Sequence, residues 1–192
     1  MPSPARWLLI LTLLVSSGPA APGAAADEAL WGALRDGRAV ALIRHALAPG
    51  TGDPTHFRLG DCATQRNLSD EGRAQARAIG DRFRAHGIET AEVHSSQWCR
   101  CLETARLLGL GPVEALPALN SFFGDRSKGQ EQTAAIERFL EPEAVGVPRV
   151  LVTHQVNITA LTGLFLGSGA IVVAKPGADG ALEVLGRLTP PP

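Results

Sequence analysis

The stretch "AVALIRHA" (residues 39–46) runs from an uninterrupted apolar segment into an arginine and a histidine. A short apolar run without alternation predicts a strand that is covered on both faces. Its cationic end then either meets the surface by chance or delivers Arg44 and His45 to a site. The second interpretation requires that the rest of the chain supply the other parts of that site.

Two further stretches supply such parts. "RVLVT" (149–153) predicts another buried strand, which His154 follows directly, and "IETAEVHSS" (88–96) leads into a short strand and then to Arg100. In parallel sheets the ligand site lies beyond the carboxyl ends of the strands. We therefore expect the two arginines and the two histidines to converge at one edge of a sheet.

Helical segments alternate with these strands. Ser69 is the predicted N-cap of a helix that turns Ala76, Ile79 and Phe83 inward and stops at Gly87. Further helices are predicted over 97–108, 130–140 and 154–166, with a strand at 112–116 and a closing hairpin from 170–174 and 181–186. This alternation predicts an α/β fold, a three-layer α/β/α sandwich with a mostly parallel sheet.

The composition is that of one globular domain without a strong charge. The chain has 192 residues, of which 45% are hydrophobic and 19% charged, and its formal net charge is −1. Such a chain has enough apolar residues for a core. No overall field draws it to nucleic acid or to an anionic membrane, so we expect neither as a partner.

The first residues are typical of a secretory signal. Arg6 precedes "WLLILTLLV" (7–15), which is short for a membrane span, and Ala24 and Ala26 fit the small-x-small pattern before a cleavage site. We predict a signal peptide at 1–26 and one mature domain at 27–192. This protein would work in the periplasm or outside the cell, without stable membrane insertion. An uncleaved anchor helix is the alternative.

The three cysteines are Cys62, Cys99 and Cys101. An exported chain meets oxidising conditions, which favour one disulfide and one remaining thiol. Cys99 and Cys101 are too close in sequence to bridge easily, so Cys62 would pair with one of them. Three free thiols are the alternative. No cysteine or histidine spacing is typical of a zinc site.

The predicted cluster of arginines and histidines suits phosphate chemistry. The guanidinium fork matches phosphate oxygens, and Arg100 lies in the first turn of its predicted helix, where free N–H groups also favour an anion. A neutral histidine is a competent nucleophile toward phosphorus. Such chemistry needs a nucleophile, charge neutralisers and a proton source, but neither a metal nor a cofactor.

Four ordered stretches resemble the histidine phosphatase superfamily, which has the phosphoglycerate mutase-like fold, and in particular its small exported branch. They are "LIRHA", "NLSDEGRAQARAIG", "SSQWCRCLETA" and "LVTHQVNITALTG", which span residues 42–163. The resemblance implies that His45 is the nucleophile and His154 a second catalytic residue. It implies that Arg44 and Arg100 bind the phosphate of a small phosphorylated substrate.

The sequence departs from the family pattern at three positions. Ala46 replaces the glycine of the usual R-H-G motif, where a positive φ would be costly for alanine. Gln155 replaces the aspartate that donates a proton in acid phosphatases, and Ser121 replaces the glutamate of mutase-type members. The general acid must therefore come from elsewhere.

Three other carboxylates are candidates for that acid. Asp53 and Asp125 lie in predicted loops and are either donors or ordinary solvated side chains. Glu103 lies one helical turn beyond Arg100, so we interpret it as the group that orients this arginine. Gln65, Arg66 and Asn67 line the rim of the pocket or belong to a turn.

The sequence predicts an exported, metal-independent phosphatase that forms a phosphohistidine intermediate on a phosphomonoester. Phosphorylated sugars of the cell envelope are candidate substrates on the analogy with the exported branch. A phosphohistidine-protein phosphatase is one alternative, although an exported address argues against it. A non-catalytic phosphate-binding module is the other.

Overall fold

A computed structural model of the protein describes residues 22–141, 146–178 and 180–189. The predicted apolar segment 7–15 of the signal peptide lies outside these residues. Helix α1 (Pro22–Arg35) contains the predicted cleavage junction, and it packs on the core through Trp31 and Leu34, which follow that junction. None of the helices formed by the described residues is both long and apolar enough to cross a membrane.

Within the described residues, six strands form one sheet in the order β3-β2-β4-β1-β5-β6. Strands β1, β2, β3 and β4 pair in parallel, whereas β5 pairs antiparallel with both β1 and β6. The predicted mostly parallel sheet with a closing hairpin is thus confirmed. The strands are β1 (Val40–Arg44), β2 (Glu92–Ser95), β3 (Val113–Ala115), β4 (Arg149–Thr153), β5 (Ile171–Pro176) and β6 (Leu182–Leu188).

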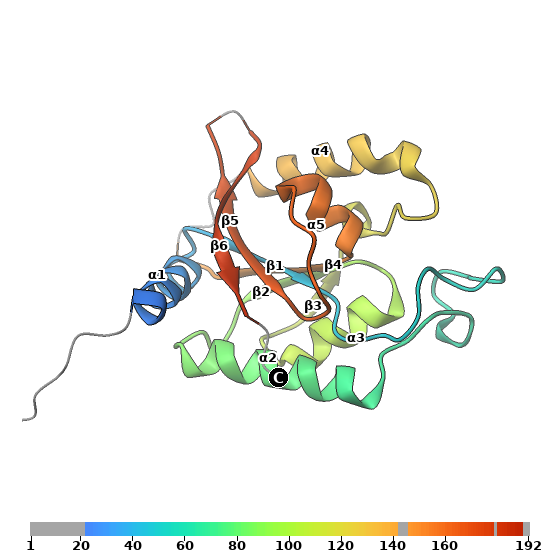
Figure 1. Cartoon of the computed structure of the whole chain (residues 1–192), viewed down its shortest axis with the longest axis horizontal. Helices are drawn as coiled ribbons and strands as arrows, with labels where there is room; N and C mark the ends of the chain where they lie inside the picture. Colours follow the sequence, from blue (N-terminus) through green and yellow to red (C-terminus); the bar gives the residue numbers. More distant parts are fainter. Residues whose placement is uncertain (1–21, 142–145, 179, 190–192) are drawn as a thin grey trace, which may run out of the picture.

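Helices cover both faces of the sheet, as the predicted three-layer architecture requires. Figure 1 shows α2 and α3 beneath the sheet and α4 and α5 above it. The long helices after α1 are α2 (Asp70–Ala85), α3 (Cys99–Leu108), α4 (Gly129–Leu140) and α5 (Gln155–Thr162). Short 3-10 turns lie at η1 (Cys62–Thr64), η2 (Pro117–Leu119) and η3 (Arg126–Lys128).

Strand β1 explains why its sequence has no polar alternation. Ala41 and Ile43 face a core that includes side chains of α1, α2 and α3, whereas Val40 and Leu42 face a second core with α4 and α5. Because both faces are covered, every residue of the strand before Arg44 is buried. Because both faces of β1 are packed against apolar cores, its register in the sheet is fixed, and with it the position of Arg44 and His45 at its carboxyl end.

Local signals in the sequence set the ends of the helices. The Ser69 hydroxyl accepts a hydrogen bond from the Gly72 N–H at 3.1 Å and caps α2 as predicted. Helix α5 is shorter than predicted, because Gly163 takes a left-handed conformation (φ 71°) and ends it at Thr162. Phe165 therefore lies in the loop before β5 and not on a helix.

Candidate active site

The three strands that precede the predicted site residues are neighbours, in the order β2-β4-β1, and are parallel. Their carboxyl ends therefore meet at one edge of the sheet. Arg44 and His45 at the end of β1, Arg100 in α3 and His154 after β4 line one cavity of about 500 Å³. The structure thus brings together all four residues that the sequence placed at this edge.

His45 is buried beside the end of β1, and its hydrogen bond defines its tautomer. Its Nδ1 lies 2.8 Å from the Ala46 carbonyl oxygen, which can only accept, so Nδ1 carries the proton and Nε2 keeps its lone pair. Burial, followed by the charges of Arg100, Arg66 and Arg44, lowers the pKa of His45 to about 3. A neutral imidazole with a free Nε2 is therefore available over most of the pH range.

The chain turns after His45 without the glycine that the family pattern supplies. Ala46 is fully buried, and its N–H donates to the Thr104 hydroxyl at 3.0 Å. Every positive φ among the described residues belongs to a glycine, so alanine fits here without backbone strain. The close approach is made instead by Gly72, where an added Cβ would lie 2.0 Å from the Leu47 carbonyl oxygen.

His154 lies opposite His45, with ring centroids 5.6 Å apart, and a chain of hydrogen bonds orients it. Arg100 can only donate, so its Nη2, 3.4 Å away, approaches the lone pair of His154 Nδ1. His154 Nε2 then donates to the Ser96 hydroxyl at 2.8 Å, and this hydroxyl donates to Asn120 Oδ1 at 3.3 Å. Burial, with Arg100 next in effect, lowers the pKa of His154 well below its ordinary value.

Three arginines line the cavity. The sequence predicted phosphate binding for Arg44 and Arg100 but left Arg66 between the pocket rim and a turn. Arg66 also lines the cavity, and its Nε donates to the Gly52 carbonyl at 2.9 Å. The Nε atoms of Arg44 and Arg100 are buried without a hydrogen-bond partner among the described residues. The three guanidinium groups together give this cavity a positive charge that suits an anion.

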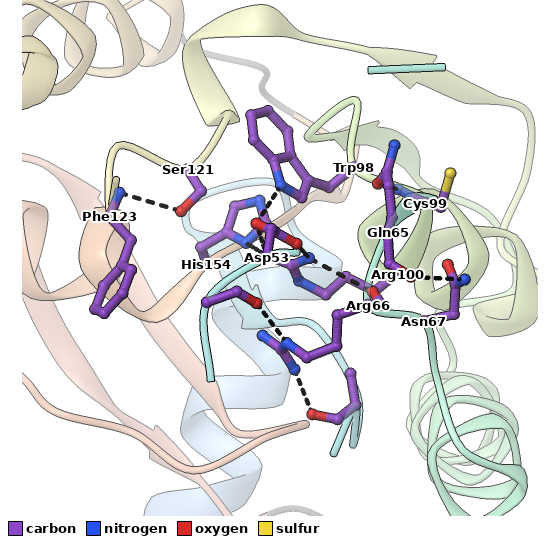
Figure 2. Close-up of polar contacts among 12 residues, drawn as sticks. Asp53, Gln65, Arg66, Asn67, Trp98, Cys99, Arg100, Ser121, Phe123 and His154 are labelled. Carbon is purple, nitrogen blue, oxygen red and sulfur yellow. Dashed lines mark hydrogen bonds and ion pairs between the residues drawn. The ribbon is translucent and has the colours of Figure 1, made fainter. Parts of the chain in front are cut away.

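Asp53 is not the solvated loop carboxylate that was the simpler interpretation of its sequence. Figure 2 shows it between Arg100 and Trp98: its oxygens accept from the Arg100 guanidinium at 2.5 and 3.3 Å and from Trp98 Nε1 at 2.9 Å. Burial acts to raise the pKa of Asp53, but the hydrogen bonds from Arg100 and Trp98 outweigh it and the pKa is lowered. The Asp53 carboxylate thus pairs with Arg100, one of the guanidinium groups that a bound phosphate would need.

The other two candidate carboxylates have structural partners. Asp125 lines the cavity, but it caps η3 by accepting from the Ser127 N–H and hydroxyl at 3.3 and 2.5 Å. Glu103 accepts from Arg73 Nε at 2.7 Å and not from Arg100, so our interpretation of Glu103 was wrong. One turn of α3 separates it from Arg100, but it faces α2, which carries Arg73.

A disulfide joins the loop before α2 to the start of α3. It links Cys62 and Cys99, one of the two pairings that the sequence allowed, and leaves Cys101 as a free buried thiol. The alternative of three free thiols is therefore wrong. The bridge holds the segment that contains Arg66 next to the first turn of α3, which carries Arg100. Had the pairing of Cys62 with Cys99 been known from the sequence, it would have indicated that Arg66 lies in the site. Burial raises the pKa of Cys101 to about 12, so this thiol stays protonated.

Among the described residues, no group of three or more histidine, cysteine, aspartate or glutamate side chains is arranged to hold a metal ion. The residues that could bind an anion are the three arginines and the two histidines. Their arrangement can hold a phosphate group against His45 Nε2 and offset its charge.

The chain belongs to the histidine phosphatase superfamily (branch 1), whose family model matches residues 40–149, more than half of the chain. The resemblance noted in the sequence is therefore confirmed at the level of the family, and membership supports a phosphatase activity. A comparison with curated proteins found no match.

Solved structures of related phosphatases share the fold. The protein histidine phosphatase SixA complexed with tungstate is 20% identical, with a TM-score of 0.57 and coverage of 79% of this chain and 97% of that chain. Phosphoserine phosphatase from Entamoeba histolytica is 14% identical, with a TM-score of 0.54 and coverage of 78% and 95%. A mycobacterial glucosyl-3-phosphoglycerate phosphatase is 14% identical, with a TM-score of 0.53 and coverage of 76% and 96%.

Proposed function

We propose that the protein is an exported phosphatase that hydrolyses phosphomonoesters through a phosphohistidine formed on His45, without a metal ion. The observation that carries this proposal is the neutral His45, whose Nδ1–H is held by the Ala46 carbonyl while its Nε2 is free. The three arginines that line the same cavity supply the positive charge that phosphoryl transfer needs.

The first step is the attack of His45 Nε2 on phosphorus. Arg44, Arg66 and Arg100 bind the non-bridging oxygens, and the bond to the leaving alcohol breaks as the N–P bond forms. Binding of the dianion favours protonation of His154 at Nδ1, which then becomes a donor to the phosphoryl group. In the second step a water molecule attacks the phosphohistidine and releases inorganic phosphate and the free imidazole.

Asp53 is the best-placed proton donor for the leaving alcohol. Its side chain is 20% exposed, and its oxygens already lie on Arg100 within the cavity. A phosphate dianion beside this carboxylate raises its pKa, because a like charge favours the protonated form. Asp125 is more exposed, at 51% of its side chain, and pairs with Lys128 at 3.4 Å, so it is the weaker candidate.

The proposal also includes the cellular location of the enzyme and the class of its substrates. Secretion through a signal peptide at 1–26 would place the enzyme in the periplasm or outside the cell, where phosphorylated envelope sugars are candidate substrates. Mass spectrometry of the intact exported protein tests the address. A mass that begins at Asp27 supports it, whereas a full-length protein retained in the membrane fraction contradicts it.

Trapping the intermediate tests the catalytic proposal. Wild-type protein incubated with a labelled, slowly hydrolysed phosphomonoester in the presence of EDTA, and quenched without acid, should carry phosphate on His45. That adduct should be stable to alkali and labile to acid. His45→Ala should abolish the adduct and turnover, whereas His56→Ala, which changes an exposed loop histidine, should retain both.

Three outcomes would overturn the proposal in different ways. Turnover retained by His45→Ala, or label on a serine or aspartate, would show that another residue is the nucleophile. Hydrolysis of a phosphohistidine peptide without hydrolysis of p-nitrophenyl phosphate would favour the phosphohistidine-protein phosphatase. Binding of inorganic phosphate without turnover of any ester would favour a phosphate-binding module.

A further inference from the structure

One part of the cavity wall is apolar and unusually exposed. Phe165 is 78% exposed and Phe123 48% exposed, and both line the cavity together with Val156. Large apolar side chains that gather on an exposed surface commonly mark a binding site. Figure 2 places Phe123 beside Ser121, on the far side of the site from Gln65.

Aromatic side chains also flank the phosphate end of the cavity. Trp98 stacks on Phe57 with ring centroids 5.0 Å apart, and its Nε1 holds Asp53. Four aromatic residues therefore line this one cavity, although aromatics make up only 5% of the chain. Flat rigid side chains of this kind contribute large contact areas at a small cost in conformational entropy.

A second cavity continues the apolar wall. It has a volume of about 380 Å³ and shares Phe123, Val156 and Phe165 with the first cavity. Arg126 is the one charged residue among its described lining residues, and the guanidinium lies 5.3 Å from the centroid of the Phe123 ring. The other polar lining residues of this cavity are Gln155 and Thr159, so apolar side chains make up most of its wall.

We propose that Phe123, Val156 and Phe165 form a binding subsite for an apolar leaving group, so that the preferred substrate is an amphiphilic phosphomonoester with an extended alkyl or ring-bearing alcohol. This inference rests on the proposed phosphatase function, but it favours an apolar alcohol over the free sugar phosphates among the candidate substrates named with that function. The arginines would bind the phosphate while the apolar wall removes the alcohol from water. A free sugar phosphate would leave its hydroxyl groups poorly paired against the same wall.

A series of ethyl, butyl and hexyl phosphate tests the subsite. The three alcohols are leaving groups of nearly equal acidity, so differences in kcat/KM report binding of the chain. Burial of one methylene corresponds to roughly a fourfold gain. We therefore expect kcat/KM to rise at least about tenfold from ethyl to hexyl phosphate, and hexyl phosphate to exceed glucose 6-phosphate by a similar factor.

Variants locate the effect within the chain. Phe123→Ala and Phe165→Ala should each lower the hexyl-to-ethyl ratio of kcat/KM, and the double variant should bring that ratio close to one. Leu185→Ala is the matched control, because Leu185 is 36% exposed on β6 and lines neither cavity. It should keep both the ratio and the activity of the wild type. Thermal unfolding of each variant checks that its fold is intact.

Binding of ethyl- and hexylphosphonate, measured by calorimetry, separates this inference from the proposed function. Hydrolysis of all three esters at equal kcat/KM, with equal affinity for the two phosphonates, overturns the apolar subsite and leaves the phosphatase. A chain-length effect that the double variant retains also overturns it. Absence of hydrolysis of every ester, with hexylphosphonate bound more tightly than ethylphosphonate, overturns the phosphatase and retains the subsite.

Discussion

The role of Asp53 can be decided by one isosteric substitution, Asp53→Asn. The wild-type carboxylate lies on Arg100, at 2.5 and 3.3 Å, and accepts from Trp98 at 2.9 Å. Asparagine keeps the size of the side chain and an acceptor for Trp98, but it has neither the charge nor the acidic proton. The substitution therefore separates competition for Arg100 from proton donation.

Asp53→Asn should strengthen the binding of inorganic phosphate but lower kcat. A hydrogen bond between charged groups contributes about 1.5–3 kcal/mol, and incoming phosphate must displace part of this interaction from Arg100. Since about 1.4 kcal/mol corresponds to a factor of ten, inorganic phosphate should inhibit Asp53→Asn roughly tenfold more strongly than wild type. Loss of a general acid lowers kcat by about 10²–10⁴ for an alcohol that is a poor leaving group.

Steady-state kinetics with two substrates measures both effects. Turnover of glycerol 2-phosphate, which has a poor leaving group, should fall by at least about a hundredfold in Asp53→Asn. Turnover of p-nitrophenyl phosphate, whose leaving group needs little protonation, should fall far less. Asp125→Asn is the comparison variant, because Asp125 is the other candidate donor at this cavity.

A similar loss for both substrates would refute proton donation by Asp53. An unchanged inhibition constant for inorganic phosphate would refute competition for Arg100. If the selective loss occurs in Asp125→Asn instead, the donor is Asp125, and its bonds to Ser127 in η3 must open in the complex with substrate.

Three more perturbations have expected outcomes. Arg100→Lys should recover little of the kcat/KM lost in Arg100→Ala, because a point charge does not reproduce the guanidinium fork; near-normal steady-state kinetics would contradict a bidentate role. Cys62→Ser should lower the free energy of unfolding by about 2–4 kcal/mol in denaturant titrations, because Cys62 and Cys99 close a loop across 37 residues; equal stability would show that the bridge contributes nothing. The pKa of His45 is about 3, below that of an unfolded histidine, so the unfolded chain binds the extra proton between these pH values. The free energy of unfolding should therefore be full above about pH 6.5 and fall toward pH 3, and a flat profile in that window would contradict the buried neutral state of His45.

The arrangement of the sheet could be predicted because two apolar runs each lead directly into polar residues of the site. Burial on both faces makes "AVALI" (39–43) and "RVLVT" (149–153) strands, and the rule for parallel sheets then places Arg44, His45 and His154 at one edge. These conclusions depend on unbroken apolar patterning within two short segments, and on the alternation of strands with helices, which predicts parallel strands.

The positions of Asp53, Arg66 and Glu103 depend on contacts that local sequence does not encode. Residues 47–66 have no periodicity, and their conformation is set by partners such as Trp98 and by the bridge between Cys62 and Cys99. For Glu103 the predicted position was right but the predicted partner was wrong. Helical spacing correctly places it one turn after Arg100, but the packing of α3 against α2 gives it Arg73 as its partner.

The arginines of the site have two linked effects on His45. They attract the phosphate, and after burial their charges are the main cause of the low pKa of His45. A proton on His45 would add a further positive charge among Arg44, Arg66 and Arg100 and would occupy the lone pair that we propose attacks phosphorus. The same positive charges would therefore favour a bound phosphate dianion, and they disfavour the protonated form of His45. In the protein without substrate, burial and the arginine charges keep the His45 imidazole neutral. The proposed nucleophile is therefore in its reactive form before phosphate binds and neutralises part of that charge, as a preorganised site requires.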